Sequence, residues 1–214
     1  EPGVPIAVVE AKDNTYSVSH GLQQALGYAE ILEIPSVFSS NGDAFASHNK
    51  FPVDGEEIET QFPLEAFPSP QALWKRYKLY RGIEVKSEEL VLQPYHLDGS
   101  GKEPRYYQVE AINRVVEAVA KGQKRMLLVM ATGTGKTYTT FQIIWRLWKA
   151  KMVKRILFLV DRNFLADQTL VNDFKPFGKV MTKIKNRKID PAYEIHLGLY
   201  QAITGPDEED KIFR

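Results

Sequence analysis

The sequence has 214 residues, of which 43% are apolar and 26% charged, so it can bury a sizeable core in one or two domains. Its longest apolar runs are far shorter than the roughly 20 residues that a membrane-spanning helix requires, and we expect no membrane partner. It has no cysteine, which excludes disulfides and cysteine-bound zinc. It also begins without a secretion signal, and the two absences together favour a cytoplasmic protein.

Charge is distributed unevenly along the chain, although the net charge is only +1. Residues 1–120 carry 10 basic and 18 acidic side chains, whereas residues 121–190 carry 16 basic and 4 acidic ones. A segment as basic as the second favours contact with phosphate, either in a nucleotide or in a DNA backbone. The alternative is a lysine-rich surface that contacts only solvent.

The first part of the chain has the pattern of a small α/β unit followed by a less regular stretch. The predicted elements are a strand at 6–9, a helix at 19–32, a strand at 35–38 ended by Asn41-Gly42, an irregular segment at 43–68 and a helix at 69–80. Alternating or continuous apolar runs indicate the strands, and clusters of Pro and Gly indicate the breaks. Ser69 is the predicted cap of the last helix, with Pro70 in its first turn.

Residues 98–104, Asp-Gly-Ser-Gly-Lys-Glu-Pro, have the composition of a linker, and a domain boundary is predicted there. Strands then alternate with helices. The predicted elements are a helix at 105–121, a strand at 125–130, a helix at 135–150, a strand at 155–160, a helix at 163–172 and a strand near 194–199. This alternation indicates a parallel sheet with both faces covered, in which ligands bind beyond the carboxyl ends of the strands.

A glycine-rich loop, Ala131-Thr-Gly-Thr-Gly-Lys-Thr137, joins the predicted strand at 125–130 to the next helix. Its two glycines allow the backbone to curl with the N–H groups turned inward, so that these groups meet phosphates at the start of the helix. The lysine would bridge the outer phosphates of ATP, and the last threonine would hold Mg²⁺. The predicted nucleotide-binding residues of the loop are Thr132, Gly133, Thr134, Gly135, Lys136 and Thr137.

The loop departs from the general P-loop pattern, because Met130 stands where a glycine is expected. This shorter form resembles motif I of superfamily-two helicases. Upstream, Arg105-Tyr-Tyr-Gln108 is similar to the adenine-reading element of the same motors. The resemblance implies that the Gln108 amide, which can both donate and accept, reads the base, and that Tyr106 or Arg105 stacks on it.

Two later segments resemble DNA-contacting elements of these motors. Residues 161–168 follow a predicted strand and are similar to motif Ia, and residues 198–201 are similar to the next such element. The resemblance implies DNA contacts through Arg162, Gln168 and Gln201. The family continues with an Asp-Glu-x-His element for Mg²⁺ and water activation. The acidic run at 207–210 is not that element, because it follows Thr-Gly-Pro and not an apolar strand.

Glu10 and Lys12 end the first predicted strand and project to one face, because strand side chains alternate. Alone, such a pair is most often a surface salt bridge. Gln24 and Tyr28 follow at helical spacing, and with the Ser-Ser-Asn-Gly at 39–42 they resemble the second half of the PD-(D/E)XK nuclease core of restriction motor subunits. The resemblance implies that Glu10 holds Mg²⁺ and that Lys12 positions the attacking water. Gln24 and Tyr28 then belong to the same catalytic set.

The order and spacing of the motifs resemble the motor subunit of type I restriction endonucleases. The resemblance implies an α/β fold with an incomplete RecA-like, parallel-sheet P-loop domain behind the remnant of a restriction-endonuclease-like domain. The implied division is 1–68 for the nuclease part, 69–104 for a connecting helix and linker, and 105–214 for a first motor domain that stops before Asp-Glu-x-His. ATP and Mg²⁺ are the implied cofactors. Double-stranded DNA and the methyltransferase and specificity subunits are the implied partners.

The implied activity is movement of duplex DNA driven by ATP hydrolysis, with cleavage by the Mg²⁺-dependent nuclease. This chain alone is expected to do neither, because each half lacks a metal-holding acid. One alternative is another nuclease and helicase fusion, such as a type III restriction or DNA-repair enzyme. A second is a nucleotide-regulated DNA-binding module without catalysis. A small-molecule P-loop kinase is disfavoured, because the nuclease-like half and Arg105–Gln108 would have no purpose in it.

Overall fold

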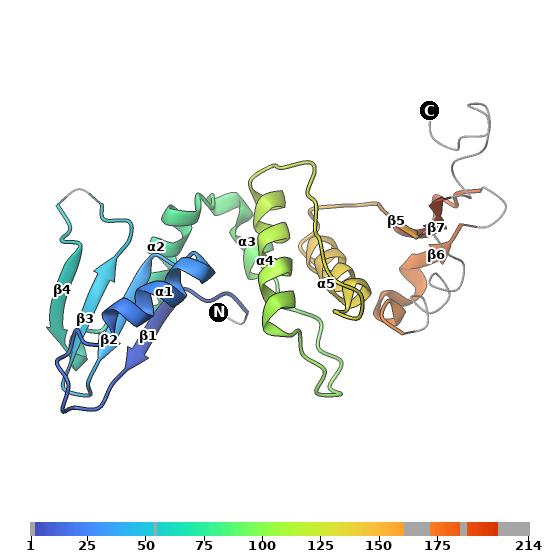
Figure 1. Cartoon of the computed structure of the whole chain (residues 1–214). Helices are drawn as coiled ribbons and strands as arrows, with labels where there is room; N and C mark the ends of the chain where they lie inside the picture. The colour runs from blue at the N-terminus through green and yellow to red at the C-terminus, as the bar shows by residue number, and fades with distance from the viewer. Residues whose placement is uncertain (1–2, 54, 161–171, 185–187, 201–214) are drawn as a thin grey trace. The chain divides into compact units, whose positions relative to one another are not determined.

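The computed structural model describes residues 3–53, 55–160, 172–184 and 188–200 (Figure 1). They fold as two compact units of mixed α/β structure. The first unit runs to Leu92 and also takes in Glu117–Lys124. The second holds Gln93–Val116 and the chain from Arg125 on. Within the described part of the chain, no helix is long and apolar enough to cross a membrane.

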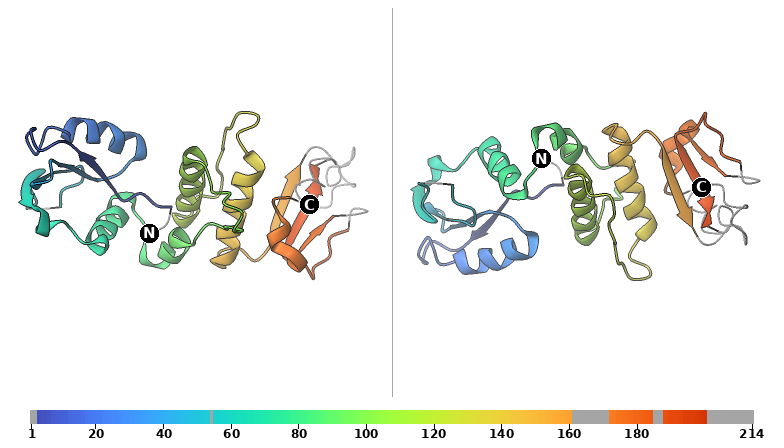
Figure 2. Two further views of the ribbon diagram at one scale, coloured as in Figure 1. Left: turned by 90° about the horizontal axis from the view of Figure 1, so that it is seen from below. Right: turned by 90° about the horizontal axis from the view of Figure 1, so that it is seen from above.

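The first unit contains a four-stranded sheet between helices. Its elements are β1 (Ala7–Ala11), α1 (Leu22–Leu32), β2 (Ser36–Ser40), β3 (Ala44–Asn49), β4 (Glu59–Pro63), η1 (Leu64–Ala66), α2 (Pro70–Arg81), η2 (Val85–Ser87) and α3 (Glu88–Leu92). The strand order is β1-β2-β3-β4, with β1 and β2 parallel and the other neighbours antiparallel. α1 and α2 lie on opposite sides of this sheet (Figure 2).

Small side chains let α1 pack closely on the sheet. Ala25 and Ala29 are fully buried and belong to one cluster with Val37 of the central strand β2, in which every residue is buried. The predicted cap of α2 is confirmed, since the Ser69 hydroxyl accepts a hydrogen bond from the Ala72 amide at 3.2 Å. Such a cap satisfies one of the amides that the first helical turn leaves free.

The prediction of an irregular segment at 43–68 was wrong, because β3 and β4 form a hairpin there. Phe45 lies opposite Phe62, with ring centroids 5.8 Å apart, and the hydroxyls of Ser47 and Thr60 are 2.8 Å apart. Cross-strand pairs of this kind stabilise an antiparallel ladder. Half of the Pro, Gly and acidic residues of this segment fall in the connection between the strands, and they obscured the short alternating runs on either side.

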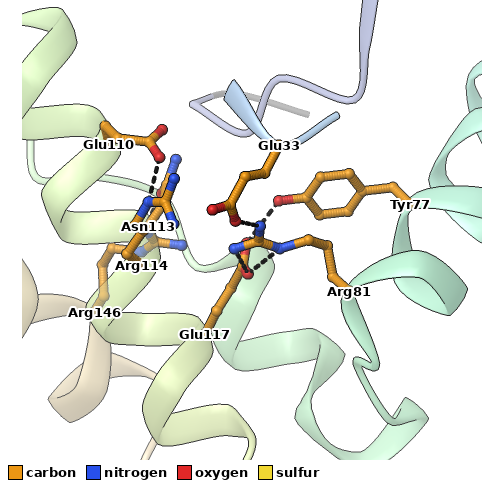
Figure 3. Close-up of polar contacts among 8 residues, drawn as sticks. All are labelled: Glu33, Tyr77, Arg81, Glu110, Asn113, Arg114, Glu117 and Arg146. Carbon is orange, nitrogen blue, oxygen red and sulfur yellow. Dashed lines mark hydrogen bonds and ion pairs between the residues drawn. The ribbon is translucent and has the colours of Figure 1, made fainter. Parts of the chain in front are cut away.

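A buried carboxylate, Glu117, anchors an ionic cluster in the first unit (Figure 3). It is 2% exposed and accepts hydrogen bonds from the Tyr77 hydroxyl at 2.6 Å and from Arg81 Nε at 2.7 Å. The same guanidinium also pairs with Glu33, at the end of α1. Burial acts to lower the pKa of Arg81, but the charge and the hydrogen bond of Glu117, together with Tyr77 and Glu33, outweigh burial and raise the pKa well above its usual value. The Arg81 guanidinium is therefore charged at every ordinary pH.

The second unit combines two helices with a parallel sheet. Its elements are the first part of α4 (Tyr106–Ala120), α5 (Lys136–Lys149), β5 (Ile156–Val160), η3 (Lys175–Val180), β6 (Met181–Lys183) and β7 (Ile195–Leu199). The strand order is β5-β7-β6, and both neighbouring pairs are parallel. Phe141 of α5 packs against Phe174, Phe177 and Ile195 in the core. The predicted parallel sheet and its helices at 105–121 and 135–150 are confirmed, to within a residue at each end.

The predicted strand at 125–130 is not formed. These residues have no regular secondary structure, and Leu127 and Val129 are 89% and 83% exposed. A strand inside a parallel sheet needs neighbours that pair with its backbone groups. Among the described strands of this unit, the ladder joins only β5, β7 and β6, so the apolar run has no such neighbour. The predicted helix at 163–172 lies outside the described residues except for its last position.

Candidate functional site

Four predicted site residues of the first unit form one chain of hydrogen bonds. The Lys12 ammonium donates to Glu10 Oε1 and to Gln24 Oε1, both at 2.8 Å. The Gln24 amide nitrogen donates to the Tyr28 hydroxyl, also at 2.8 Å. Glu10 belongs to β1 and Lys12 directly follows that strand, two positions along, whereas α1 supplies the other two side chains from positions one turn apart. Two neighbouring elements thus hold an acid, a base, an amide and a phenol in a row.

Gly21 and Ser39 allow this close approach, and the sequence prediction did not include them among the site residues. Ser39 is fully buried, faces Glu10 in the β1–β2 register, and its hydroxyl accepts a hydrogen bond from the Gly21 amide at 3.1 Å. A Cβ on Gly21 would come within 2.7 Å of Glu10 Cγ and 2.8 Å of the Ser39 hydroxyl. Only glycine therefore fits before α1. The Ser-Ser-Asn-Gly pattern was the available signal for Ser39.

Glu10 is the carboxylate that this row of side chains offers to Mg²⁺. Mg²⁺ is commonly held by one or two carboxylates together with waters and substrate phosphate. Glu10 fits as one such ligand, and its side chain is 18% exposed beside Lys12. Across the described residues, no group of three or more Asp, Glu, His or Cys side chains comes together as a metal site. Glu10 therefore has the chemistry that one Mg²⁺ ligand needs.

The phosphate loop of the second unit has the backbone conformation that an anion nest needs. Gly133 and Gly135 have φ angles of +82° and +81°, a region that favours glycine. The Thr134 hydroxyl donates to the Ala131 carbonyl oxygen at 2.7 Å, which closes the turn. The Lys136 ammonium lies over the same turn, donating to the Ala131 carbonyl oxygen at 3.1 Å. These contacts within the loop hold its curled backbone in place.

α5 begins at the end of this loop with free donors. Gly135 is its N-cap residue, and no side chain caps the first turn. The first amides of a helix have no partner within the helix, and the helix dipole adds partial positive charge there. Thr137 lies half-buried in this first turn, and Thr132 is exposed in the loop. Backbone amides, an ammonium and a hydroxyl are thus gathered where an anion could bind.

Gln108 joins α4 to the phosphate loop. It is 5% exposed, and its amide nitrogen donates to the Thr134 carbonyl oxygen at 2.9 Å. Its amide oxygen accepts from the Arg105 backbone amide at 2.9 Å. The Tyr107 hydroxyl contacts the same Thr134 carbonyl at 3.3 Å, whereas Tyr106 is 86% exposed. Sequence reasoning singled out Gln108 but missed Tyr107, because no spacing rule distinguished the two adjacent tyrosines.

A buried polar contact links the helices that carry these groups (Figure 3). Arg146 of α5 is 2% exposed, and its Nη1 donates to Asn113 Oδ1 of α4 at 2.7 Å. The Tyr95 hydroxyl donates to the same oxygen at 2.8 Å, and the guanidinium lies 5.1 Å from the Tyr95 ring centroid. Burial raises the pKa of Tyr95, although Arg146 and Asn113 act in the opposite direction. A buried guanidinium without hydrogen-bond partners would be costly, so the contact between Arg146 and Asn113 favours this packing of α4 against α5.

The three predicted DNA contacts, Arg162, Gln168 and Gln201, lie outside the described residues. Gln201 directly follows Tyr200, where the described part of the chain ends. The other two predicted groups lie in separate units. The predicted nuclease-like residues lie together in the first unit, and those of the phosphate loop lie together in the second.

The chain is similar to known subunits of restriction enzymes. Residues 101–213 match the family model described as "Type III restriction enzyme, res subunit". The chain is 57% identical over all of its 214 residues to the EcoAI endonuclease subunit, a type I restriction enzyme subunit from Escherichia coli, and covers 26% of that protein. It is also 53% identical over 66 residues to the EcoKI endonuclease subunit of Escherichia coli K12, which is 31% of this chain and 6% of that protein.

A solved fragment of an HsdR subunit of a type I restriction enzyme from Vibrio vulnificus YJ016 has a similar fold. The TM-score is 0.75 at 40% sequence identity, and the match covers 94% of this chain and 36% of that one. The chain thus spans about a quarter to a third of the long relatives that it matches throughout. These matches show that the chain belongs to the endonuclease (HsdR) subunits of type I restriction enzymes, and that residues 101–213 match the helicase-like ResIII family.

Proposed function

We propose that this chain provides the ATP-binding part of a DNA translocase and part of a Mg²⁺-dependent nuclease that acts in a type I restriction system. The observation that carries the proposal is the phosphate loop. Two glycines at positive φ open α5 without a side-chain cap, and the buried Gln108 holds the loop to α4. These features are what ATP phosphates and an adenine base require from a P-loop motor.

In the motor half, each group of the loop has a distinct role. The amides of Gly133, Gly135 and the first turn of α5 bind the phosphates, and the Lys136 ammonium, which lies over the same loop, pairs with the outer phosphates. Thr137 supplies a hydroxyl for the Mg²⁺ that accompanies ATP. Gln108 retains one amide hydrogen beyond its bond to Thr134, which allows it to contact adenine. A RecA-like fold for residues 105–214 is part of this proposal.

In the nuclease half, Glu10 is a ligand of Mg²⁺, which when bound would polarise the phosphodiester and activate water. Lys12 neutralises the charge of the attacked phosphate and orients the nucleophile. Gln24 positions Lys12 through their 2.8 Å contact, and Tyr28 positions Gln24 in turn. We assign residues 1–68 to the nuclease part and 69–104 to the connection, on the basis of this row of side chains on β1 and α1.

Duplex DNA is the proposed substrate, and the methyltransferase and specificity subunits are the proposed partners. The match of all 214 residues to the EcoAI endonuclease subunit, of which the chain covers 26%, supports these assignments. A second candidate is another nuclease and helicase fusion, which the type III description of the matched family model favours. A 57% identity over the whole chain to a type I subunit favours the first candidate more strongly. ATPase that DNA stimulates without strand separation would distinguish a translocase from a helicase.

Calorimetric titration of the chain with ADP and with a non-hydrolysable ATP analogue, with and without Mg²⁺, tests the proposal. Binding is expected for the wild-type chain and for Lys121→Ala, which removes an exposed lysine of the first unit. Lys136→Ala should bind at least about tenfold more weakly, because it removes a charge from the outer phosphates. A wild-type chain that binds neither nucleotide, or a Lys136→Ala variant that binds equally well, would overturn the proposal.

A further inference from the structure

A second pocket lies in the same unit as the phosphate loop, at the other end of α5. It has a volume of about 720 Å³. Its lining includes four cations and two aromatic side chains, namely Lys149, Lys151, Lys154, Arg155, Trp148 and Tyr193. α5 has 14 residues, so a rise of 1.5 Å per residue places this end about 20 Å from Lys136. The pocket is therefore not part of the nucleotide site.

The position of the pocket on the sheet leads to the same conclusion. Arg155 directly precedes β5, and Glu194, which also lines the pocket, directly precedes β7. The pocket thus lies at the amino ends of parallel strands. Nucleotides bind beyond the carboxyl ends of such strands. Whatever occupies this pocket approaches the sheet from the edge opposite to the phosphate loop.

The charge of the pocket is strongly positive and is not cancelled within the described structure. Lys151, Lys154 and Arg155 are exposed, and none of the four cations forms an ion pair with any carboxylate of the described residues. Glu194 is the acidic residue of the lining, and its carboxylate accepts a hydrogen bond from the Trp148 indole nitrogen. One carboxylate therefore faces four cations.

Two aromatic side chains, Trp148 and Tyr193, belong to the lining of the pocket. Lys149 Nζ lies 4.9 Å from the Trp148 ring centroid and 4.7 Å from that of Trp145, which is outside the lining. A lysine at the end of α5 also complements the helix dipole, which accounts for Lys149. It does not account for Lys154 and Arg155, because these belong to the segment that leads into β5. The surplus of positive charge beside aromatic faces needs another explanation.

We propose that this pocket binds the phosphate backbone of DNA, at a site separate from the nucleotide loop. Cations track the phosphates of a strand, aromatic faces accept bases or sugars, and an arginine fork such as that of Arg155 matches phosphate oxygens. An acidic protein segment would use the cations but would have no need of the aromatic side chains in the lining. The inference goes beyond the proposed function, because it assigns DNA binding to residues outside the phosphate loop and outside the predicted DNA contacts.

DNA binding by a charge-reversal variant tests the inference. Lys154→Glu/Arg155→Glu is compared with wild type by fluorescence anisotropy on a labelled 20-base-pair duplex and on a single strand of equal length, without nucleotide. The control, Lys75→Glu/Lys121→Glu, makes the same change in net charge at exposed positions of the first unit. The pocket variant should lose on the order of tenfold in affinity at low salt, and its salt dependence on duplex should be shallower by about two released counterions. The control should bind like wild type.

Three outcomes would overturn the inference. These are equal losses in both variants, no loss in either, or equal competition by polyglutamate of matched charge, which would indicate an acidic protein partner. Because the substituted side chains are exposed, the fold should persist, and an unchanged circular dichroism spectrum and melting temperature verify this. Nucleotide binding by the pocket variant should equal that of wild type. Lys136→Ala should keep its DNA affinity, so failure of this inference is distinguishable from failure of the proposed function.

Discussion

The amide nitrogen of Gln108 lies 2.9 Å from the carbonyl oxygen of Thr134 and donates a hydrogen bond to it. This contact, beside that of the Tyr107 hydroxyl with the same carbonyl, joins the first turn of α4 to the loop in front of α5, across 26 positions of sequence. The space between the two is filled, since a Cβ on Gly135 would come within 2.5 Å of the same nitrogen. The loop therefore depends on a glycine for its backbone angle and also for its packing against Gln108.

Gly135→Ala should destabilise the second unit and weaken nucleotide binding. An alanine at φ +81° costs about 1–2 kcal/mol in backbone strain alone, and its methyl group displaces the Gln108 amide. Gly27→Ala is the matched control, because a Cβ on Gly27 in α1 meets nothing within 4 Å. That change should stabilise the helix by roughly 0.5–1 kcal/mol. Urea unfolding and ADP calorimetry measure both effects, and a Gly135→Ala variant that matches wild type in both would contradict the argument.

Arg81→Met should destabilise the first unit by about 3–5 kcal/mol, because it leaves the carboxylate of Glu117 buried without its ionic partner. Lys86→Met is the control, since it removes an equally close but exposed ion pair with Glu84, and it should have no measurable effect. A double variant, Arg81→Met/Glu117→Gln, should recover much of the loss because no buried charge remains. Chemical unfolding of the four proteins tests this order, and an Arg81→Met variant as stable as Lys86→Met would refute it.

Local sequence signals predicted much of the candidate site, because the groups that matter follow fixed periods. Glu10 and Lys12 share a face by strand alternation, and Gln24 and Tyr28 do so by helical spacing, and both relationships appear as 2.8 Å contacts. The meeting of the two pairs through Lys12 and Gln24 depends on how α1 packs on β1. No pattern within either element specifies that packing.

Other features depended on partners distant in sequence. The run at 125–130 has the composition of a buried strand, but a strand forms only where neighbours pair with it, and the sequence pattern does not show whether they are present. The hairpin of β3 and β4, by contrast, forms although its local sequence does not predict strands. Its paired residues Phe45 and Phe62 are separated in the sequence by a loop rich in strand-breaking residues. The secondary structure of both segments therefore depends more on long-range strand pairing than on local propensity.

The second unit should lose stability as the pH falls below about 6.5, the ordinary pKa of histidine. Burial lowers the pKa of His96; Asp98 opposes this effect and Lys149 adds to it. The unfolded chain therefore binds a proton at a pH where the folded chain does not, and protonation favours unfolding as the pH falls toward the folded pKa. Melting temperatures between pH 7.5 and 5.5 should decline less for His96→Gln than for wild type. Equal declines would show that His96 does not contribute to the pH dependence.

Mutation should separate the two sites in the complete restriction complex. Glu10→Ala removes the proposed Mg²⁺ ligand and should abolish cleavage, because a phosphodiester has no comparable electrophilic help without its metal. Its ATPase should survive, since Glu10 lies in the first unit and the phosphate loop in the second. Lys136→Ala removes a charge that stabilises the transferring phosphoryl group, and it should lower ATPase at least about a hundredfold.

Cleavage by Lys136→Ala should fail as well, because a translocating nuclease cuts only after it has moved, and this asymmetry between the two variants is the distinctive expectation. Supercoiled-plasmid cleavage and ATP hydrolysis are measured in parallel, with Glu30→Ala on the exposed surface of α1 as the control for loss of a carboxylate. The control should retain both activities. If Glu10→Ala cuts like wild type, the nuclease assignment is wrong, and the contact between Glu10 and Lys12 is only a partly exposed salt bridge.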